Sequence, residues 1–195
     1  MQQQEDHHQR KSTRLKEYDY TQPGAYFVTV VSHQRKNIFG VISNGEMNLN
    51  KAGKIVEKTW QNIPVHFPNT SCEIFVVMPN HIHGIIDIIN DEIVGARHAS
   101  PLRSNRLESQ SVKSDGVKAK SIGAIIGSFK SAVTKQLHQT KIINQEKIWQ
   151  RNYYEHIIRD EDDYQQIADY IASNPSNWEC DLENLKTSIH FHKSI

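Results

Sequence analysis

The chain has few cysteines and no long hydrophobic run, and these two features limit the classes of protein to which it can belong. Its 195 residues include two cysteines, Cys72 and Cys180, which are far apart in the sequence. Neither has the spacing of a zinc site, and so few thiols suit a reducing cytosol better than a disulfide framework. No apolar segment approaches the ~20 residues that span a bilayer, and the polar start Met1–His8 lacks the apolar stretch of a signal peptide. We therefore predict a soluble, cytoplasmic protein with no membrane partner.

The net charge is close to neutral, but the charged residues are unevenly distributed. The formal charge is +1 at pH 7. Arg97–Lys147 holds ten basic and three acidic residues, whereas Glu155–Glu183 holds nine acidic residues and one arginine. A local basic patch suits a nucleic-acid backbone, although two solvated surfaces of opposite sign would give the same pattern. The chain also has no glycine-rich loop of the kind that cradles nucleotide phosphates, so we expect no nucleotide cofactor.

The apolar pattern predicts an α+β fold. Aromatic and β-branched runs predict strands over 25–32, 71–78, 81–89 and 153–158, with short irregular β structure over 38–50. Helices are predicted over 50–62, over 120–138, and from Asp160 to Ser173–Pro175, because proline disfavours helix at the residue before it. The order β, α, β, β, α, β is that of the ferredoxin-like split βαβ fold, an antiparallel sheet with two helices on one face. A further helix follows it here.

The domain boundaries follow from the same pattern. Residues 1–13 are polar and predicted to be a disordered tail, 14–178 a single domain, and 179–195 a C-terminal tail. Residues 90–118 have little periodicity and are predicted to be a long loop, which in a compact domain is commonly functional or disordered. In a split βαβ sheet the third predicted strand is central, and the face without helices is left for a ligand.

That third predicted strand contains two histidines, His81 and His83, separated by Ile82. Side chains alternate along a strand, so both imidazoles lie on one face and the isoleucine points into the core. Two imidazoles on one face can bind one metal ion, and a purely structural run would more cheaply use valine or threonine. Taken alone, such a pair is about as often a satisfied or surface pair as a metal site. Two ligands are also too few to hold a metal well.

The last predicted helix offers a third ligand and a nucleophile. Tyr170 and Asn174 are four residues apart, so they lie on one face of the helix, one turn from each other. The asparagine carbonyl is a neutral oxygen ligand that suits Mg²⁺ or Mn²⁺. The tyrosine oxygen can act as a nucleophile, but its ordinary pKa near 10 means that it needs a positive charge or a metal nearby. Taken alone, Tyr170 is more often an ordinary half-buried helix tyrosine.

These segments resemble one enzyme superfamily. Met78–Gly84 resembles the His-hydrophobic-His motif of the HUH single-strand endonucleases, and Asp169–Pro175 resembles the catalytic helix of their single-tyrosine transposase branch. More narrowly, the chain is similar to the REP-associated tyrosine transposases in three further segments: Tyr18–Thr29, Gly127–Ala132 and Trp149–Arg159. The resemblance extends over most of the chain, from Arg14 to Trp178, and its five segments occur in the same order.

The resemblance implies a transposase that cleaves single-stranded DNA near hairpins and rejoins strands, with 14–178 as its HUH domain. Tyr170 would be the catalytic nucleophile and form a 5′-phosphotyrosine, while His81, His83 and Asn174 would bind the divalent metal, Mg²⁺ or Mn²⁺. The implied partners are single-stranded or hairpin DNA and, as in some relatives, a second copy of the chain in a homodimer. Such a protein would be cytoplasmic and associated with the nucleoid.

Basic residues are the candidates for holding the DNA backbone. Each of them, taken singly, is more often a solvated side chain. The sequence specificity of the DNA is not implied by the resemblance, because the predicted loop over 90–118 is distinctive here. The candidate DNA-binding residues are Arg14, Arg97, Arg103, Arg106, Lys118, Lys120 and Lys130.

Two other functions fit parts of the sequence. A domesticated protein would bind hairpin DNA without moving it, and its metal site would be idle. A zinc-dependent hydrolase would use His81, His83 and a third histidine, with His156 as the nearest candidate and the tail pair His190 and His192 as a weaker one. If Tyr170 were not the nucleophile, the next candidates would be three tyrosines that we expect to pack in a strand or a helix core: Tyr153, Tyr154 and Tyr164.

Overall fold

The computed structural model describes residues 18–89, 120–144 and 146–184 of the chain. The predicted N-terminal tail and the whole predicted loop over 90–118 therefore lie outside the described residues. In chain order the elements are β1 (Gly24–Val31), η1 (His33–Arg35), β2 (Gly40–Ser43), β3 (Glu46–Leu49), α1 (Lys51–Gln61), α2 (Ile63–His66), β4 (Thr70–Ser71), β5 (Phe75–Val77), β6 (His81–Ile88), α4 (Ile122–Gln139), β7 (Tyr154–Ile158), α5 (Glu161–Ser173) and η2 (Trp178–Cys180).

An antiparallel sheet forms the centre of the fold. Its strands run in the order β4, β6, β1 and β7, and β5 also pairs with β6. β1 pairs with β6 along its whole length, from Gly24 opposite Ile88 to Val31 opposite His81. The predicted α+β class and the antiparallel sheet are confirmed. β5 and β6 form a hairpin, because they are antiparallel partners joined by the short turn that contains Pro79.

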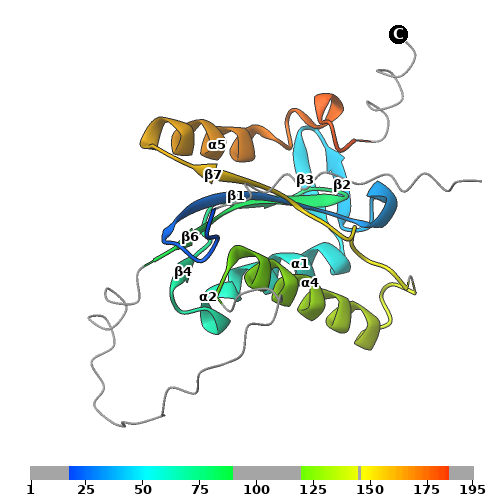
Figure 1. The fold of residues 1–195 in the computed structure, drawn as a ribbon. Coiled ribbons are helices and arrows are strands. Elements are labelled where there is room, and N and C mark those ends of the chain that lie inside the picture. Colours follow the sequence, from blue (N-terminus) through cyan, green and yellow to red (C-terminus); the bar gives the residue numbers. More distant parts are fainter. Residues whose placement is uncertain (1–17, 90–119, 145, 185–195) are drawn as a thin grey trace, which may run out of the picture.

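The helices α1 and α4 cover one face of this sheet (Figure 1). Both begin where a side chain caps the first turn: Asn50 accepts a hydrogen bond from the Gly53 backbone N–H, and Ser121 accepts one from Ala124. Trp60 of α1 lies so close to β6 that a Cβ added to Gly84 would be 2.4 Å from its ring. Glycine at this position therefore lets the Trp60 side chain pack closely against the strand.

The C-terminal helix α5 lies on the opposite face of the sheet (Figure 1). It packs there through a small apolar cluster made of Phe27, Ile85, Ile158 and Ile171. Asp160 caps the helix by accepting a hydrogen bond from the Asp163 backbone N–H, at the end where the helix dipole favours acidic residues. The sequence predicted this helix, but it left the whole face free for a ligand; the structure leaves only the part that α5 does not cover.

The segment predicted as irregular β structure is a regular hairpin. β2 and β3 pair with each other in a separate two-stranded sheet. Asn44 and Gly45 join them with φ values of 54° and 75°, and positive φ at both central residues is the geometry for which Asn-Gly is favoured. Within the described ranges, no helix is both long enough and apolar enough to cross a bilayer.

Candidate active site

His81 and His83 lie on the face of β6 that faces α5, and Ile82 between them points into the main core. This is the alternation that the sequence predicted. Both imidazoles are buried, with 0% and 3% of their surface exposed, and their ring centroids are 4.3 Å apart. Phe27 of β1 stacks on His83 at 5.4 Å. The two rings are therefore held close together by the sheet and shielded from water.

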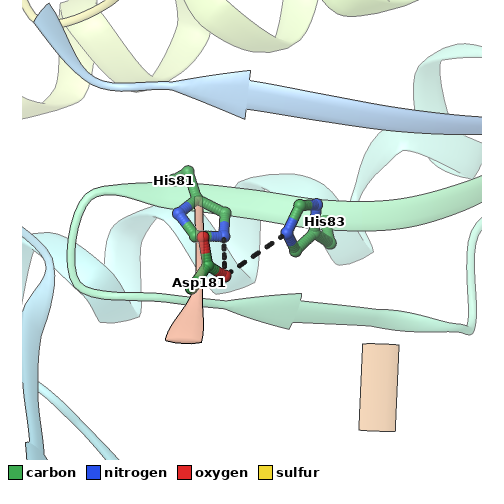
Figure 2. A group of neighbouring side chains, drawn as sticks. All are labelled: His81, His83 and Asp181. Carbon is green, nitrogen blue, oxygen red and sulfur yellow. Dashed lines mark ion pairs between the residues drawn. The ribbon is translucent and has the colours of Figure 1, made fainter. Parts of the chain in front are cut away.

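Asp181 completes a three-residue group with the two histidines. Figure 2 shows its carboxylate on one side of the two rings, with Oδ2 3.7 Å from His81 Nε2 and 4.0 Å from His83 Nε2. The three possible ligand atoms all lie within 4.8 Å of one another, and all three residues are buried. Two imidazole nitrogens and a carboxylate oxygen in this arrangement can hold a metal ion.

Three atoms at this site are buried without a hydrogen-bond partner among the described residues: His81 Nε2, Asn174 Oδ1 and Asp181 Oδ2. A buried polar atom left unsatisfied costs roughly 1–3 kcal/mol. Such atoms are rare in native proteins, and an unseen ion is one of the explanations they call for. A bound cation would accept the lone pairs of these three atoms, so the residues fit a metal ion.

Burial keeps both histidines neutral at physiological pH. It lowers the pKa of His83 to about 3. The pKa of His81 lies well below its ordinary value, first because of burial and then because protonated His83 and Arg35 would repel a second positive charge. Neutral imidazole is the form that binds metal. Burial also raises the pKa of the Asp181 carboxyl, and the hydrogen bond from the Glu183 backbone N–H partly offsets this.

Tyr170 of α5 reaches the same group. Its hydroxyl lies 3.2 Å from His83 Nε2, and its ring contacts Phe27 edge-on at 6.1 Å. The side chain is half-buried, with 46% of its surface exposed. Burial raises the pKa of its phenol, the nearby Asp181 carboxylate raises it further, and a hydrogen bond from Asn174 lowers it. The phenol therefore lies close to the group formed by His81, His83 and Asp181. Its raised pKa keeps it protonated unless a cation lies nearby.

Asn174 caps the end of α5 and is 3% exposed. It lies at the site, one helical turn after Tyr170, as its position in the sequence predicted. Hydrogen bonds from its side chain lower the pKa values of both Tyr170 and Asp181. Its Oδ1 is the second of the unpartnered atoms described above. The predicted ligand role of Asn174 stays a prediction, and Asp181 adds an oxygen donor that the sequence did not single out.

The other candidate residues lie elsewhere or have other partners. His156 Nε2 is 2.9 Å from the Asp163 carboxylate, and within the described residues it does not belong to the metal group. His190 and His192 lie outside the described residues. Tyr164 packs at the edge of the apolar cluster under α5, and Tyr153 packs against the main core. Tyr154 is about half exposed.

Of the seven predicted DNA-binding residues, the structure describes Lys120 and Lys130. Arg14, Arg97, Arg103, Arg106 and Lys118 lie outside the described residues. Lys120 is exposed at the start of the segment that leads into α4. Lys130 is different, because its ammonium donates to the backbone carbonyls of Gln150 at 2.6 Å and Arg151 at 3.1 Å. Burial lowers its pKa to about 8, and its contacts fix the chain just before β7.

Comparison with known proteins shows which solved structures have a similar fold. No family model matches the chain. A Haemophilus influenzae protein described as uncharacterized is 44% identical to it over 174 residues, which cover 89% of this chain and 92% of that protein. The solved structure of a REP-associated tyrosine transposase bound to a REP hairpin has a TM-score of 0.55 and 18% identity, and the match covers 86% of this chain and 74% of that one. The predicted resemblance is thus confirmed at the level of the fold.

A second solved structure, of a candidate transposase from Deinococcus radiodurans, is more distant. It has a TM-score of 0.44 and 14% identity, and the match covers 83% of this chain and 96% of that one. At this score the likeness adds no support for a shared function.

Proposed function

Since the chain belongs to the same family as the Haemophilus influenzae protein and has the fold of a REP-associated tyrosine transposase, we propose that it is a metal-dependent single-stranded DNA endonuclease and strand transferase. One observation carries the proposal. The Tyr170 hydroxyl lies 3.2 Å from His83 Nε2, which is one of the three buried ligand atoms that can hold a metal. The candidate nucleophile thus lies beside the residues that would hold an electrophilic metal ion.

Mg²⁺ or Mn²⁺ is the proposed metal. His81 and His83 supply two neutral nitrogens, and the third donor is an oxygen of Asp181 or Asn174. Oxygen ligands suit Mg²⁺ and Mn²⁺, and the carboxylate adds a negative charge that attracts a divalent cation. When bound there, the ion supplies electrophilic stabilisation of a phosphate oxygen.

Tyr170 is the proposed nucleophile. Its oxygen forms a bond to the phosphorus of the scissile phosphate while the bond from phosphorus to the 3′ oxygen breaks. The phenol loses its proton, the departing 3′ oxygen gains one, and the products are a 5′-phosphotyrosine and a free 3′-hydroxyl. A second 3′-hydroxyl can reverse the attack and rejoin strands without ATP, because the phosphotyrosine retains a phosphodiester bond.

Single-stranded DNA carrying a hairpin is the proposed substrate. The REP-associated transposase of similar fold was solved with a REP hairpin, which makes such a hairpin the first ligand to test here. Tyr170 is half exposed whereas His81 is fully buried, so a phosphate can approach from the tyrosine side. Tyr170 and His81 lie at the same site within one chain.

The test is covalent trapping. The full chain is incubated with end-labelled single-stranded hairpins and Mn²⁺, and a protein–DNA adduct that survives denaturing electrophoresis is expected. Chelation with EDTA and the His81→Ala variant should each abolish the adduct, whereas the control His66→Ala changes an exposed histidine of α2 and should preserve it. DNA cleavage without an adduct, or a normal adduct from His81→Ala, would contradict the proposal.

A further inference from the structure

Asn80 is a buried residue whose side chain joins three segments of the chain. None of its surface is exposed. Its amide nitrogen donates to the Arg35 backbone oxygen at 3.1 Å and to the Glu183 backbone oxygen at 2.7 Å. Its Oδ1 lies 2.7 Å from Nδ1 of His81. The whole hydrogen-bonding capacity of the Asn80 N–H₂ group is therefore used at the edge of the proposed metal site.

These contacts fix the orientation of the Asn80 amide. Its two partners at Arg35 and Glu183 are carbonyl oxygens, which only accept hydrogen bonds. The nitrogen must therefore face them, because a flipped amide would set its oxygen against two acceptors. Oδ1 is left facing His81, and an oxygen without hydrogen can only accept. Nδ1 of His81 must then carry the ring hydrogen, which leaves the lone pair on Nε2.

We propose that Asn80 is a positioning residue that holds His81 in the Nδ1–H tautomer, with its Nε2 lone pair turned toward the metal position before a metal binds. That Nε2 is the atom 3.7 Å from Asp181 Oδ2, and it has no hydrogen-bond partner among the described residues. A ligating histidine is commonly oriented in this way by a hydrogen bond at its other nitrogen. The proposal rests on the metal site of the proposed function.

His83 lacks an equivalent constraint. Its Nδ1 lies 2.8 Å from the Thr29 hydroxyl, and its Nε2 lies 3.2 Å from the Tyr170 hydroxyl. A hydroxyl can donate or accept, so both tautomers of His83 satisfy these contacts. The fixed tautomer is therefore specific to His81.

Asn80 also holds the segment that contains Asp181. Its bond to the Glu183 oxygen fixes the backbone two residues after Asp181, and the Glu183 N–H donates to Asp181 Oδ1 at 2.6 Å. One amide thus orients two of the proposed ligands. Its loss should loosen both donors.

The test reads the tautomer directly by nuclear magnetic resonance of the metal-free full chain with ¹⁵N-labelled histidine. In the wild type the ring hydrogen of His81 is expected on Nδ1. Asn80→Ala should lose this preference. The control Thr70→Val removes a buried hydroxyl of the same sheet, which donates to the Phe67 backbone oxygen, and should leave the His81 signals unchanged.

Calorimetric titration with Mn²⁺ gives the second measurement. Asn80→Ala should weaken Mn²⁺ binding by about 10- to 100-fold, the usual effect of losing an outer-shell partner. A wild-type His81 with its hydrogen on Nε2, or an Asn80→Ala variant with unchanged tautomer and affinity, would overturn the role of Asn80. Absence of Mn²⁺ binding by the wild type, with the tautomer as predicted, would instead contradict the proposed metal site.

A separate observation concerns Tyr154, an exposed aromatic residue on the site face of the sheet. The strand register sets Tyr154 opposite Thr29, and Thr29 opposite His83, so the three side chains form a row across three strands. The Tyr154 ring is 49% exposed and contacts the Phe27 ring at 6.1 Å. Tyr154 therefore packs against one apolar ring and keeps about half of its surface exposed.

We infer that Tyr154 stacks against a base of the bound single strand next to the scissile phosphate. Neighbouring strands are ~4.8 Å apart, which puts Tyr154 ~10 Å from His83 in the sheet. Exposed aromatic rings beside a phosphate-binding position are the usual platform for single-stranded nucleic acid, because any base can stack on them. Arg151, which is exposed three residues earlier, can follow the backbone. This inference also rests on the proposed function.

The test compares the affinities of variants for a fluorescent single-stranded oligothymidylate. Tyr154→Ala should raise Kd by about 5- to 150-fold, the loss of one stacked base, whereas Tyr154→Phe should bind nearly as the wild type does. Val65→Ala, which changes an exposed residue of α2, is the control. Equal affinities of Tyr154→Ala and the wild type would overturn the inference. Failure of the wild type to bind would contradict the proposed function instead.

Discussion

The Tyr170 hydroxyl lies 3.2 Å from Nε2 of His83. The same nitrogen faces the Asp181 carboxylate at 4.0 Å, so the proposed nucleophile touches the group of residues that can hold a metal. Burial and the Asp181 charge both raise the pKa of the phenol. The site therefore disfavours the reactive phenolate until a cation offsets the carboxylate, and this links metal binding to activation of the nucleophile.

The first prediction concerns the ionisation of Tyr170. Without metal its pKa should lie above the ordinary value of 10, and saturating Mg²⁺ should lower it, because a cation favours the charged phenolate. Ultraviolet absorbance titration of the wild type minus that of Tyr170→Phe isolates this phenol from the other tyrosines. A difference curve that does not move on addition of Mg²⁺ would show that the metal and the phenol are not coupled.

The second prediction concerns the third metal ligand. A metal that binds only the folded chain stabilises it, by roughly 2.7 kcal/mol at a hundredfold excess over Kd. Asp181→Ala should lose most of the stabilisation by Mn²⁺ in a denaturant titration, because it removes the charged donor. Asn174→Ala should lose less. Asp162→Ala, which changes an exposed acid of α5, is the control. The reverse order of the two site variants would assign the ligand to Asn174.

The third prediction concerns pH. Burial lowers the pKa of His83 to about 3, so below its ordinary value of 6.5 the unfolded chain binds more protons than the folded one. Stability that is complete above pH 6.5 should fall as the pH is lowered, by roughly 1.4 kcal/mol per pH unit for one imidazole. The raised pKa of Asp181 acts in the opposite direction and partly offsets the loss.

Urea unfolding of the metal-free chain at about pH 7.5, 6.5 and 5.5 measures this slope. The variant His83→Gln should reduce the slope to the part that His81 contributes, and the exposed-site control His66→Gln should leave it unchanged. A free energy of unfolding that is the same at all three pH values would show that the histidines are not held neutral by burial.

The fourth prediction concerns Gly84, which follows His83 in β6. An added methyl group would lie 2.4 Å from the Trp60 ring, so Gly84→Ala should lower the free energy of unfolding by about 1–3 kcal/mol. Gly127 in α4 provides a matched control, because a methyl group added there would have no atom within 4 Å. Gly127→Ala should instead stabilise the helix by about 0.5–1 kcal/mol. Equal effects of the two changes would contradict the packing of Trp60 on the strand.

Local sequence patterns predicted the elements that position the site. The alternation across His81, Ile82 and His83 placed both imidazoles on one face, and four-residue spacing placed Tyr170 and Asn174 on one side of α5. These features depend only on the geometry of a strand and of a helix. They need no knowledge of which elements pack together.

Asp181 could not be predicted in this way. It follows η2, in a segment with no apolar periodicity, and it reaches the histidines because Asn80 and Arg35 hold Glu183 through contacts more than a hundred residues apart in sequence. Similarly, the use of Lys130 as a donor to the carbonyls before β7 depends on tertiary packing. The sequence alone does not distinguish Asp181 from the other acidic residues of Glu155–Glu183, because burial beside the histidines is a property of the folded chain.

The central claim is that Tyr170 becomes covalently linked to DNA. The most direct test digests the adduct formed with Mn²⁺ and a single-stranded hairpin, and identifies the DNA-linked peptide by mass spectrometry. The prediction is a nucleotide attached through its 5′ phosphate to Tyr170, and no adduct from Tyr170→Phe. Attachment to Tyr153, Tyr154 or Tyr164, or an adduct that persists in Tyr170→Phe, would contradict it.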